Sequence, residues 1–260
     1  MTRLLVFDSG VGGLSVAAAI RDRHPGAEMI YVADDAGFPY GAWEEAALTA
    51  RVVDVISGLV GRHAPDAVVI ACHTASTLVL PPLRERFALP FVGTVPAIKP
   101  AAEGTRSGIV GVLATPGTIR RDYTRGLIES FARDVHVRLV GSANLASLAE
   151  QRMRGEAVDD AAIRAEIMPA FIEQDGRRTD TIVLACTHYP FLRDAFERLA
   201  PWPVAWIDPA PAIARRVGTM IGGRADQAAA GGRALLTSGR AWPAALLSRL
   251  AALGLLADAG

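Results

Sequence analysis

Asp66-Ala-Val-Val-Ile-Ala-Cys72 and Asp180-Thr-Ile-Val-Leu-Ala-Cys186 are two short apolar stretches that resemble each other along their whole length. Each begins with an aspartate, is rich in aliphatic residues and ends in a cysteine that polar residues follow. This pattern is typical of a parallel β-strand that is covered on both faces. Cys72 and Cys186 would then lie at the carboxyl ends of their strands, the edge at which open α/β sheets bind ligands. We therefore expect two similar halves that each contribute one thiol to a shared site.

Strand patterns alternate with helical patterns through both halves, which predicts an α/β fold of parallel sheets joined by helical crossovers. The predicted strands cover residues 4–7, 29–33, 66–71, 91–93, 107–113, 135–140 and 180–185. The predicted helices cover residues 14–23, 43–63, 76–86, 119–131, 145–174 and 242–256.

Two proline-containing stretches mark the predicted domain boundaries. The first is the linker 94–100, and the second is Asp208-Pro209, where Asp208 is a predicted helix N-cap with proline at the first helical position. We expect the amphipathic helix at the C-terminus to pack back on the first half. The predicted domains are therefore residues 1–95 plus 209–260 and residues 96–208.

Composition argues against several classes of function. Lys plus Arg and Asp plus Glu each number 27, so the net charge is zero and no basic field suggests a nucleic-acid partner. Apolar runs are interrupted early, the first of them by Asp8, which argues against an export signal or a membrane span. A chain with two cysteines and no export signal is expected in the reducing cytoplasm, where thiols more often do chemistry than form disulfides.

Asp8 ends the first apolar strand and precedes a glycine-rich turn. The turn 9–13 does not match the dinucleotide-binding fingerprint and lacks the lysine of a phosphate-binding loop. It is either a tight connection between strand and helix, or a place where backbone N–H groups bind a carboxylate. Because a carboxylate at the end of an apolar strand is costly to bury without a partner, Asp8 is a candidate functional residue, with Ser9 beside it.

The cysteines admit other interpretations. A free cysteine is commonly a core residue, but two in repeated contexts favour a functional pair. Cys72, His73, Cys186 and His188 are nominally a zinc-binding set, yet adjacent residues at a strand end point apart, so we expect no metal. A Cys-His hydrolase would need one thiol only. A pyridoxal-phosphate enzyme needs a Schiff-base lysine, and the single lysine, Lys99, lies in the proline-flanked linker, so we expect no cofactor.

Two opposed thiols suit proton transfer at a stereocentre. Racemisation removes a weakly acidic proton from Cα and returns one to the opposite face. Cysteine titrates near pH 8.5 and its surroundings can lower that value, so one cysteine can act as thiolate while the other acts as thiol. Each needs a polar neighbour that exchanges protons, and the sequence offers Asp8 in the first half and His188 in the second.

Four motifs in order along the chain resemble the glutamate racemases of the cofactor-independent aspartate/glutamate racemase superfamily. They are Asp8-Ser-Gly10, Phe38-Pro-Tyr-Gly41, Ala71-Cys-His-Thr-Ala-Ser76 and Ala185-Cys-Thr-His-Tyr-Pro190. The resemblance implies two pseudosymmetric α/β domains with parallel sheets, the first completed by the C-terminal segment, and an active site in the cleft between them. It also implies interconversion of L- and D-glutamate, which supplies D-glutamate for bacterial peptidoglycan.

The resemblance further implies roles for individual residues. The cysteine at Cys72 would deprotonate D-glutamate and the one at Cys186 L-glutamate, while Glu150 would assist His188, although a helix glutamate that faces water is an equally common finding. Substrate contacts are expected from Asp8, Ser9, Tyr40, Gly41, His73, Thr74, Thr187 and His188, with Thr115 and Thr118 as further contributors. Tyr40 and Gly41 could instead only shape a turn.

His73 departs from the family pattern, which has asparagine after the first cysteine. An amide donates and accepts without charge, whereas an imidazole can protonate near neutrality. His73 could replace the hydrogen bond of the amide, reshape the pocket, add a pH dependence, or mark weak activity or preference for another acidic amino acid such as aspartate. Homodimerisation also stays open. Binding to DNA gyrase, reported for some members, is a non-enzymatic alternative that the neutral charge does not support.

Overall fold

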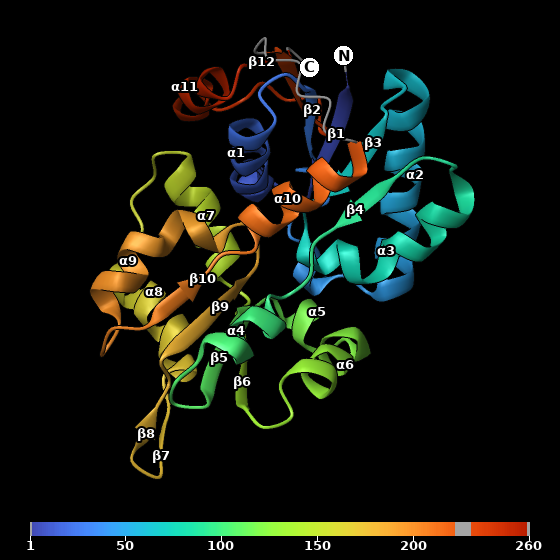
Figure 1. Ribbon diagram of the computed structural model, residues 1–260. Helices are drawn as coiled ribbons and strands as arrows, with labels where there is room; N and C mark the ends of the chain where they lie inside the picture. The colour runs from blue at the N-terminus through green and yellow to red at the C-terminus, as the bar shows by residue number, and fades with distance from the viewer. Residues whose placement is uncertain (1, 222–229, 259–260) are drawn as a thin grey trace.

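The structure, a computed structural model, describes residues 2–221 and 230–258. Its main strands form two parallel sheets that lie one above the other in Figure 1. The six-stranded sheet has the order β12-β11-β2-β1-β3-β4, and the four-stranded sheet has the order β10-β9-β5-β6. The predicted α/β class with two parallel sheets is thereby confirmed.

The strands have the following bounds. The larger sheet contains β1 (Arg3–Asp8), β2 (Glu28–Ala33), β3 (Ala67–Ile70), β4 (Phe91–Gly93), β11 (Gly232–Leu236) and β12 (Leu255–Ala257). The smaller sheet contains β5 (Ile109–Ala114), β6 (His136–Gly141), β9 (Thr181–Ala185) and β10 (Ala205–Ile207). A separate antiparallel hairpin is formed by β7 (Glu173–Gln174) and β8 (Arg177–Arg178).

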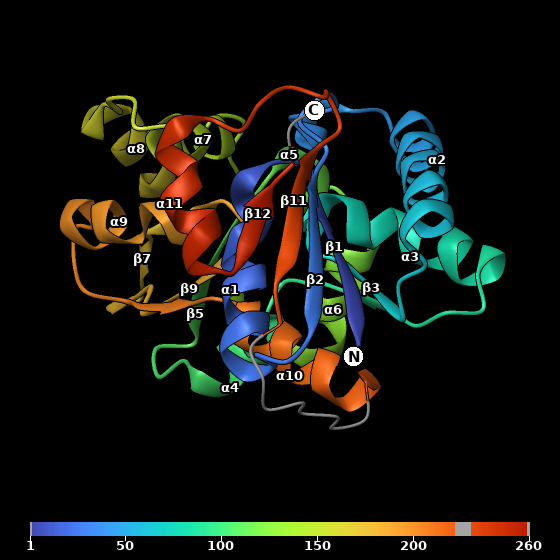
Figure 2. The same ribbon diagram turned by 90° about the horizontal axis from the view of Figure 1, so that it is seen from above.

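Helices cover both faces of the six-stranded sheet. They are α1 (Leu14–Arg23), α2 (Glu45–His63), α3 (His73–Arg86), α10 (Ala210–Ile221) and α11 (Ala244–Ala252). Alternate residues of β1 face opposite ways: Leu4 and Val6 pack with α1, α10 and α11, whereas Leu5 and Phe7 pack with α2 and α3. Figure 2 shows these two layers on either side of the strands. The expected return of the C-terminal helix to the first half is confirmed by Leu246, which is fully buried in this core.

The four-stranded sheet is covered in the same manner. Its helices are α4 (Ile98–Gly104), α5 (Pro116–Ile119), α6 (Asp122–Phe131), α7 (Leu145–Met153), α8 (Asp160–Ile167) and α9 (Arg193–Leu199). Leu113 and Leu184 face the core under α7, α8 and α9, and Val112 and Val183 face the core under α4 and α6. Each half is thus a three-layer sandwich whose central strands, β1 and β3 in one sheet and β5 and β9 in the other, are buried on both faces.

Several predicted boundaries were wrong. The expected helix 145–174 is split, because the chain turns at Gly155 with a φ of 81° and a new helix begins at Asp160, where the N-cap Asp159 accepts from the Ala161 amide. The expected helix 119–131 is likewise two helices, the first capped by the Thr115 hydroxyl. Cys72 is itself the N-cap of α3, which therefore begins three residues earlier than expected.

The linker and the C-terminal part of the chain also differ from expectation. The linker 94–100 already contains the start of α4. The C-terminal helix ends at Ala252, and Gly254, with a φ of 67°, leads into β12. β10, β11 and β12 were not predicted, because they are short and partly exposed. Asp208 does cap α10, since its carboxylate accepts from the Ala210 amide at 2.8 Å. The predicted first domain, residues 1–95 plus 209–260, includes residues 1, 222–229 and 259–260, which lie outside the described residues. The division into these two domains stays a prediction.

None of the helices within residues 2–221 and 230–258 is long and apolar enough to cross a membrane.

Candidate active site

Both cysteines line one cavity at the carboxyl ends of the two sheets. Cys72 follows β3 and Cys186 follows β9, and each thiol-bearing residue is less than 10% exposed, at 5% and 7% respectively. The cavity wall also includes these residues named from the sequence: Ser9, Tyr40, Gly41, His73, Thr74, Thr115, Thr187 and His188. Asp8, Glu150 and Thr118 lie behind this wall, in contact with residues that form it. Residues from both sheets thus enclose a single small site.

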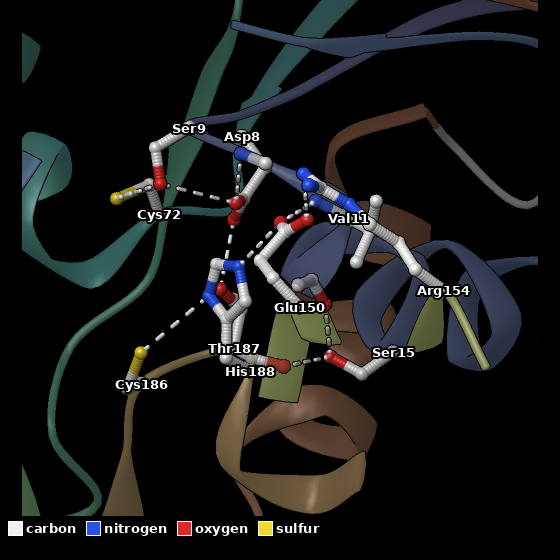
Figure 3. A network of polar contacts seen from close by, with 12 residues as sticks. Asp8, Ser9, Val11, Ser15, Cys72, Glu150, Arg154, Cys186, Thr187 and His188 are labelled. Atoms are coloured by element: carbon white, nitrogen blue, oxygen red, sulfur yellow. Dashed lines mark hydrogen bonds and ion pairs between the residues drawn. The ribbon is translucent and has the colours of Figure 1, made fainter. Parts of the chain in front are cut away.

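On the side of Cys186, three side chains form a continuous polar chain (Figure 3). His188 Nδ1 lies 3.7 Å from Cys186 Sγ, and His188 Nε2 lies 3.0 Å from Glu150 Oε1. Glu150 is held in turn by the Val11 amide at 2.7 Å and by Arg154 at 3.1 Å. This arrangement has the order of a nucleophile, a histidine and an orienting carboxylate, in which the carboxylate fixes the imidazole and favours its charged form.

The charges of this group follow from its contacts. Burial opposes protonation of His188, but hydrogen bonds and charges from Cys186 and Glu150 outweigh it and raise the pKa of His188 well above its ordinary value. Burial likewise opposes ionisation of Glu150, yet His188, Val11 and Arg154 bring its pKa below the ordinary value. The His188 imidazolium thus places a positive charge next to Cys186.

On the side of Cys72, the polar chain leads to Asp8. The Cys72 thiol donates to the Ser9 hydroxyl at 3.7 Å, and Ser9 donates to Asp8 Oδ1 at 3.4 Å. Asp8 also accepts from the Gly10 amide at 3.0 Å and from the Thr187 hydroxyl at 2.9 Å. Because Thr187 belongs to the other half, Asp8 joins the two sheets at the site.

Cys72 favours its thiol form in this structure. Burial, together with the negative charge of Asp8, raises the pKa of Cys72 to about 12. Burial also raises the pKa of Asp8, although the nearby charge of His188 works in the opposite direction. The two cysteines are therefore unequal: Cys186 has a cationic neighbour, whereas Cys72 has an anionic one.

The Tyr40 side chain does not point its hydroxyl at the cavity. The hydroxyl donates to Asp34, a residue that does not line the site, whereas Tyr40 itself forms part of the cavity wall. Contact of Tyr40 with substrate stays a prediction. Gly41 has a steric role, because a Cβ there would lie 3.1 Å from Thr115 Cβ of the other half. The turn therefore lines the site while the phenol O–H of Tyr40 is engaged by Asp34.

Threonines meet across the cleft. The Thr74 hydroxyl lies 2.8 Å from that of Thr115 and 3.3 Å from that of Thr118. Arg121, the N-cap residue of α6, also pairs with Glu45 of α2. These contacts join the two halves around the cavity, in addition to the Asp8 to Thr187 hydrogen bond.

His73 is buried and uncharged. Its Nε2 lies 3.2 Å from the Thr94 hydroxyl, and Nδ1 has no hydrogen-bond partner among the described residues. Burial lowers the pKa of His73 to about 3. Burial thus opposes a charge on His73 near neutrality, so we expect no pH dependence from this residue there. Since Cys72 turns to Ser9 while His73 turns to Thr94, the two adjacent residues do point apart.

Two site residues were not singled out from the sequence. The Phe38 ring packs against the His188 ring with centroids 5.4 Å apart, and Arg154 binds Glu150 from one helical turn away. The spacing of four residues between Glu150 and Arg154 is a recognisable helical ion-pair pattern and could have identified Arg154. Within the described part of the chain, no group of three or more His, Cys, Asp or Glu residues is arranged to hold a metal ion.

Residues 14–217 match the family described as Asp/Glu/Hydantoin racemase. The chain belongs to this family. Glutamate racemases of Brucella anthropi and Sinorhizobium medicae are each 61% identical to this chain over 219 residues. These residues are 84% of this chain, 79% of the Brucella protein and 81% of the Sinorhizobium protein. The crystal structure of Escherichia coli glutamate racemase with L-glutamate and the activator UDP-MurNAc-ala is 38% identical, with a TM-score of 0.87 and coverage of 100% of this chain and 98% of that one. Membership of the racemase family, inferred from four motifs, is thus confirmed.

Proposed function

We propose that this protein is a glutamate racemase, an isomerase that interconverts L- and D-glutamate with Cys72 and Cys186 as its two acid/base groups and without a cofactor. The observation that carries the proposal is that both thiols line one buried cavity, each at the carboxyl end of a different sheet. The high identity to proteins named glutamate racemase favours glutamate over aspartate as the substrate.

Conversion of L-glutamate begins at Cys186. Its thiolate, stabilised by the His188 imidazolium, takes the Cα proton, so that a C–H bond breaks and an S–H bond forms. The electron pair left on Cα then accepts a proton from the Cys72 thiol on the opposite face, and Cys72 becomes a thiolate. The reverse reaction begins with Cys72 as thiolate and Cys186 as thiol.

The Cys72 thiolate needs compensation, because burial and Asp8 both oppose it. The α-ammonium group of a bound amino acid supplies a positive charge close to both residues. The Ser9 hydroxyl also connects Cys72 to Asp8 and offers a path for a proton between them. The thiol at Cys72 therefore becomes an effective base only when substrate occupies the cavity.

Neutral donors bind the two carboxylates of the substrate. Thr74 contributes a hydroxyl group to the cavity, and His73 contributes an uncharged imidazole whose Nδ1 has no partner among the described residues. The hydroxyls of Ser9 and Thr187 also line the cavity, and each must turn from Asp8 to donate to the substrate. The first turn of α3, which follows Cys72, adds backbone N–H groups at a helix N-terminus, where negative charge is favoured. A site with these donors selects a small amino acid with two carboxylates by hydrogen bonding.

The wider role of the protein follows from this chemistry. D-Glutamate supply for peptidoglycan and a cytoplasmic location are parts of the proposal, and a homodimer stays a prediction. Asp8 is the partner of the first cysteine through Ser9, and its direct contact with substrate stays a prediction, since it lies behind the cavity wall. The alternative racemase chemistry through a pyridoxal Schiff base is disfavoured by Lys99, which is 59% exposed in its side chain and pairs with Glu103 on α4.

The proposal is tested by circular dichroism of purified protein with L-glutamate, D-glutamate, L-aspartate and D-aspartate in separate samples. We expect the signal of both glutamate enantiomers to decay to zero without added cofactor, and Cys72→Ser and Cys186→Ser each to abolish the decay. A signal that decays only with aspartate would show that glutamate is not the substrate. Full activity in either cysteine variant would show that the mechanism is wrong.

A further inference from the structure

A buried carboxylate that takes no part in the proton transfers lies behind the turn that carries Tyr40 and Gly41. Asp34 directly follows β2, next to the strand that ends in Asp8, and its amide donates to the Asp8 carbonyl at 2.8 Å. Asp34 is 0% exposed and does not line the cavity. A carboxylate so fully removed from water requires strong partners.

Asp34 has partners from three separate parts of the chain. Arg51 of α2 binds both carboxylate oxygens, each at 2.6 Å. Thr237, just after β11, donates to Oδ1 at 2.5 Å, and the Tyr40 hydroxyl donates to Oδ2. Despite burial, these donors hold the pKa of Asp34 below its ordinary value, so it is ionised. A fully satisfied buried network of this kind fixes one conformation of the groups that it joins.

The segment 34–43 wraps around this ion pair. A Cβ on Gly37 would lie 2.4 Å from Arg51 Nε and 2.7 Å from Asp34 Oδ2, so only glycine allows the backbone to pass so close. The Trp43 indole donates to the Gly37 carbonyl at 2.9 Å, and the Arg51 guanidinium lies 5.7 Å from the centre of the Trp43 ring. The ion pair is therefore the core around which the segment is built.

The other side of the same segment faces the cavity. Phe38 packs against His188, Gly41 packs against Thr115, and Tyr40 is part of the cavity wall. Tyr40 is the link between the two sides, because its ring is only 2% exposed and its hydroxyl is held by Asp34. Burial and the charge of Asp34 raise the pKa of Tyr40, so the hydroxyl stays a neutral donor.

We propose that Asp34, held by Arg51 and Thr237, is a positioning residue that sets the Phe38–Gly41 turn against the substrate through its hydrogen bond with Tyr40. This inference rests on the proposed racemase function, since the turn is assigned to substrate binding. It predicts that residues remote from the cavity control the affinity for substrate. Because displacement of binding groups by about 1 Å can cost as much as about 100-fold in rate, a small shift of the turn is measurable.

The test compares Tyr40→Phe, Arg51→Gln and Arg51→Lys with the control Arg3→Gln. Arg3 also pairs with an acidic residue, Glu28, at 2.9 Å in the same sheet, but at the opposite ends of the strands. We expect KM for glutamate to rise about tenfold in Tyr40→Phe and Arg51→Gln, which each remove a hydrogen bond to a charged group, with a smaller loss in kcat. Arg51→Lys keeps the positive charge but not the bidentate hydrogen bonding, so its affinity for glutamate should lie between those of the wild type and Arg51→Gln.

Arg3→Gln should lower the midpoint of thermal unfolding and leave KM unchanged. If Tyr40→Phe and Arg51→Gln also lower only the unfolding midpoint, Asp34 is a purely structural residue and the inference is overturned. Failure of the wild-type protein to racemise glutamate would overturn the proposed function instead. In that event ¹⁹F NMR of 5-fluorotryptophan at Trp43 decides the question: its resonance should shift in Tyr40→Phe and Arg51→Gln but not in Arg3→Gln, and an unshifted resonance contradicts the inference.

Discussion

Glu150→Gln keeps the shape of the side chain but removes the negative charge that Glu150 presents to His188 Nε2 at 3.0 Å. Glu150 is only 4% exposed, so water does not replace the lost charge. A hydrogen bond to a charged group contributes about 1.5–3 kcal/mol, and one pKa unit corresponds to about 1.4 kcal/mol. The pKa of His188 should therefore fall by about one to two units. The fraction of protein with an imidazolium beside a Cys186 thiolate then falls about 10- to 100-fold above that pKa.

The assay is the initial rate of racemisation from each enantiomer, together with the titration of His188 by NMR. L- and D-glutamate have equal free energies, so the equilibrium constant is one and kcat/KM must fall by the same factor in both directions. Glu156→Gln is the matched control, because Glu156 is exposed just beyond the end of α7. If Glu150→Gln matches this control in rate and leaves the His188 titration unchanged, Glu150 does not support the imidazolium and the reasoning is refuted.

Three further variants test other parts of the site. The raised pKa of His188 means that its charge stabilises the fold below the ordinary value near 6.5 and that this contribution is lost as pH rises through the raised value. His188→Gln should therefore lower the free energy of unfolding in urea by about 3 kcal/mol at about pH 6 and by less at alkaline pH. A decrease that does not vary with pH would contradict this expectation. His73→Asn should leave the shape of the pH profile of kcat/KM unchanged, because burial keeps His73 neutral, and a displaced acidic limb near neutrality would show that His73 titrates there. Thr74→Val removes a contact to Thr115 across the cleft, and it should raise KM and lower the free energy of unfolding by about 1 kcal/mol. Thr77→Val is the control, because the Thr77 hydroxyl bonds within its own helix. Equal KM values in the two variants would show that the contact between Thr74 and Thr115 does not shape the site.

The strands that carry the cysteines could be predicted because they are continuous apolar runs. Ala67–Ile70 and Thr181–Ala185 are buried at every position, and such runs are evident without any knowledge of their neighbours. Gly232–Leu236 could not be found in this way, because it pairs with β2 but has exposed and half-exposed positions. Its place in the sheet depends on a partner about two hundred positions earlier, which local periodicity does not encode.

The residues of the site likewise divide into those that a local pattern identifies and those that depend on distant partners. Cys72 and Cys186 stand out because their surroundings are repeated, and His188 follows from its place beside Cys186. The contact between Val11 and Glu150 joins positions 139 apart, so no local pattern could distinguish Glu150 from a solvated helix residue. The hydrogen bond from the Tyr40 hydroxyl to Asp34 could not be predicted, because nothing in the motif around Tyr40 shows that Asp34 lies beside it.

The central claim, that Cys72 and Cys186 act on opposite faces of one carbon, is tested most directly by racemisation of L-glutamate in ²H₂O. The reaction is stopped at low conversion, the enantiomers are separated, and deuterium at Cα is measured in each by mass spectrometry. The Cys72 thiol exchanges with solvent before substrate binds, whereas the proton from L-glutamate passes to Cys186. The D-glutamate formed should therefore carry deuterium, while the remaining L-glutamate keeps its proton. D-Glutamate that retains the original proton would show that a single group carries it between the faces, and would contradict the claim.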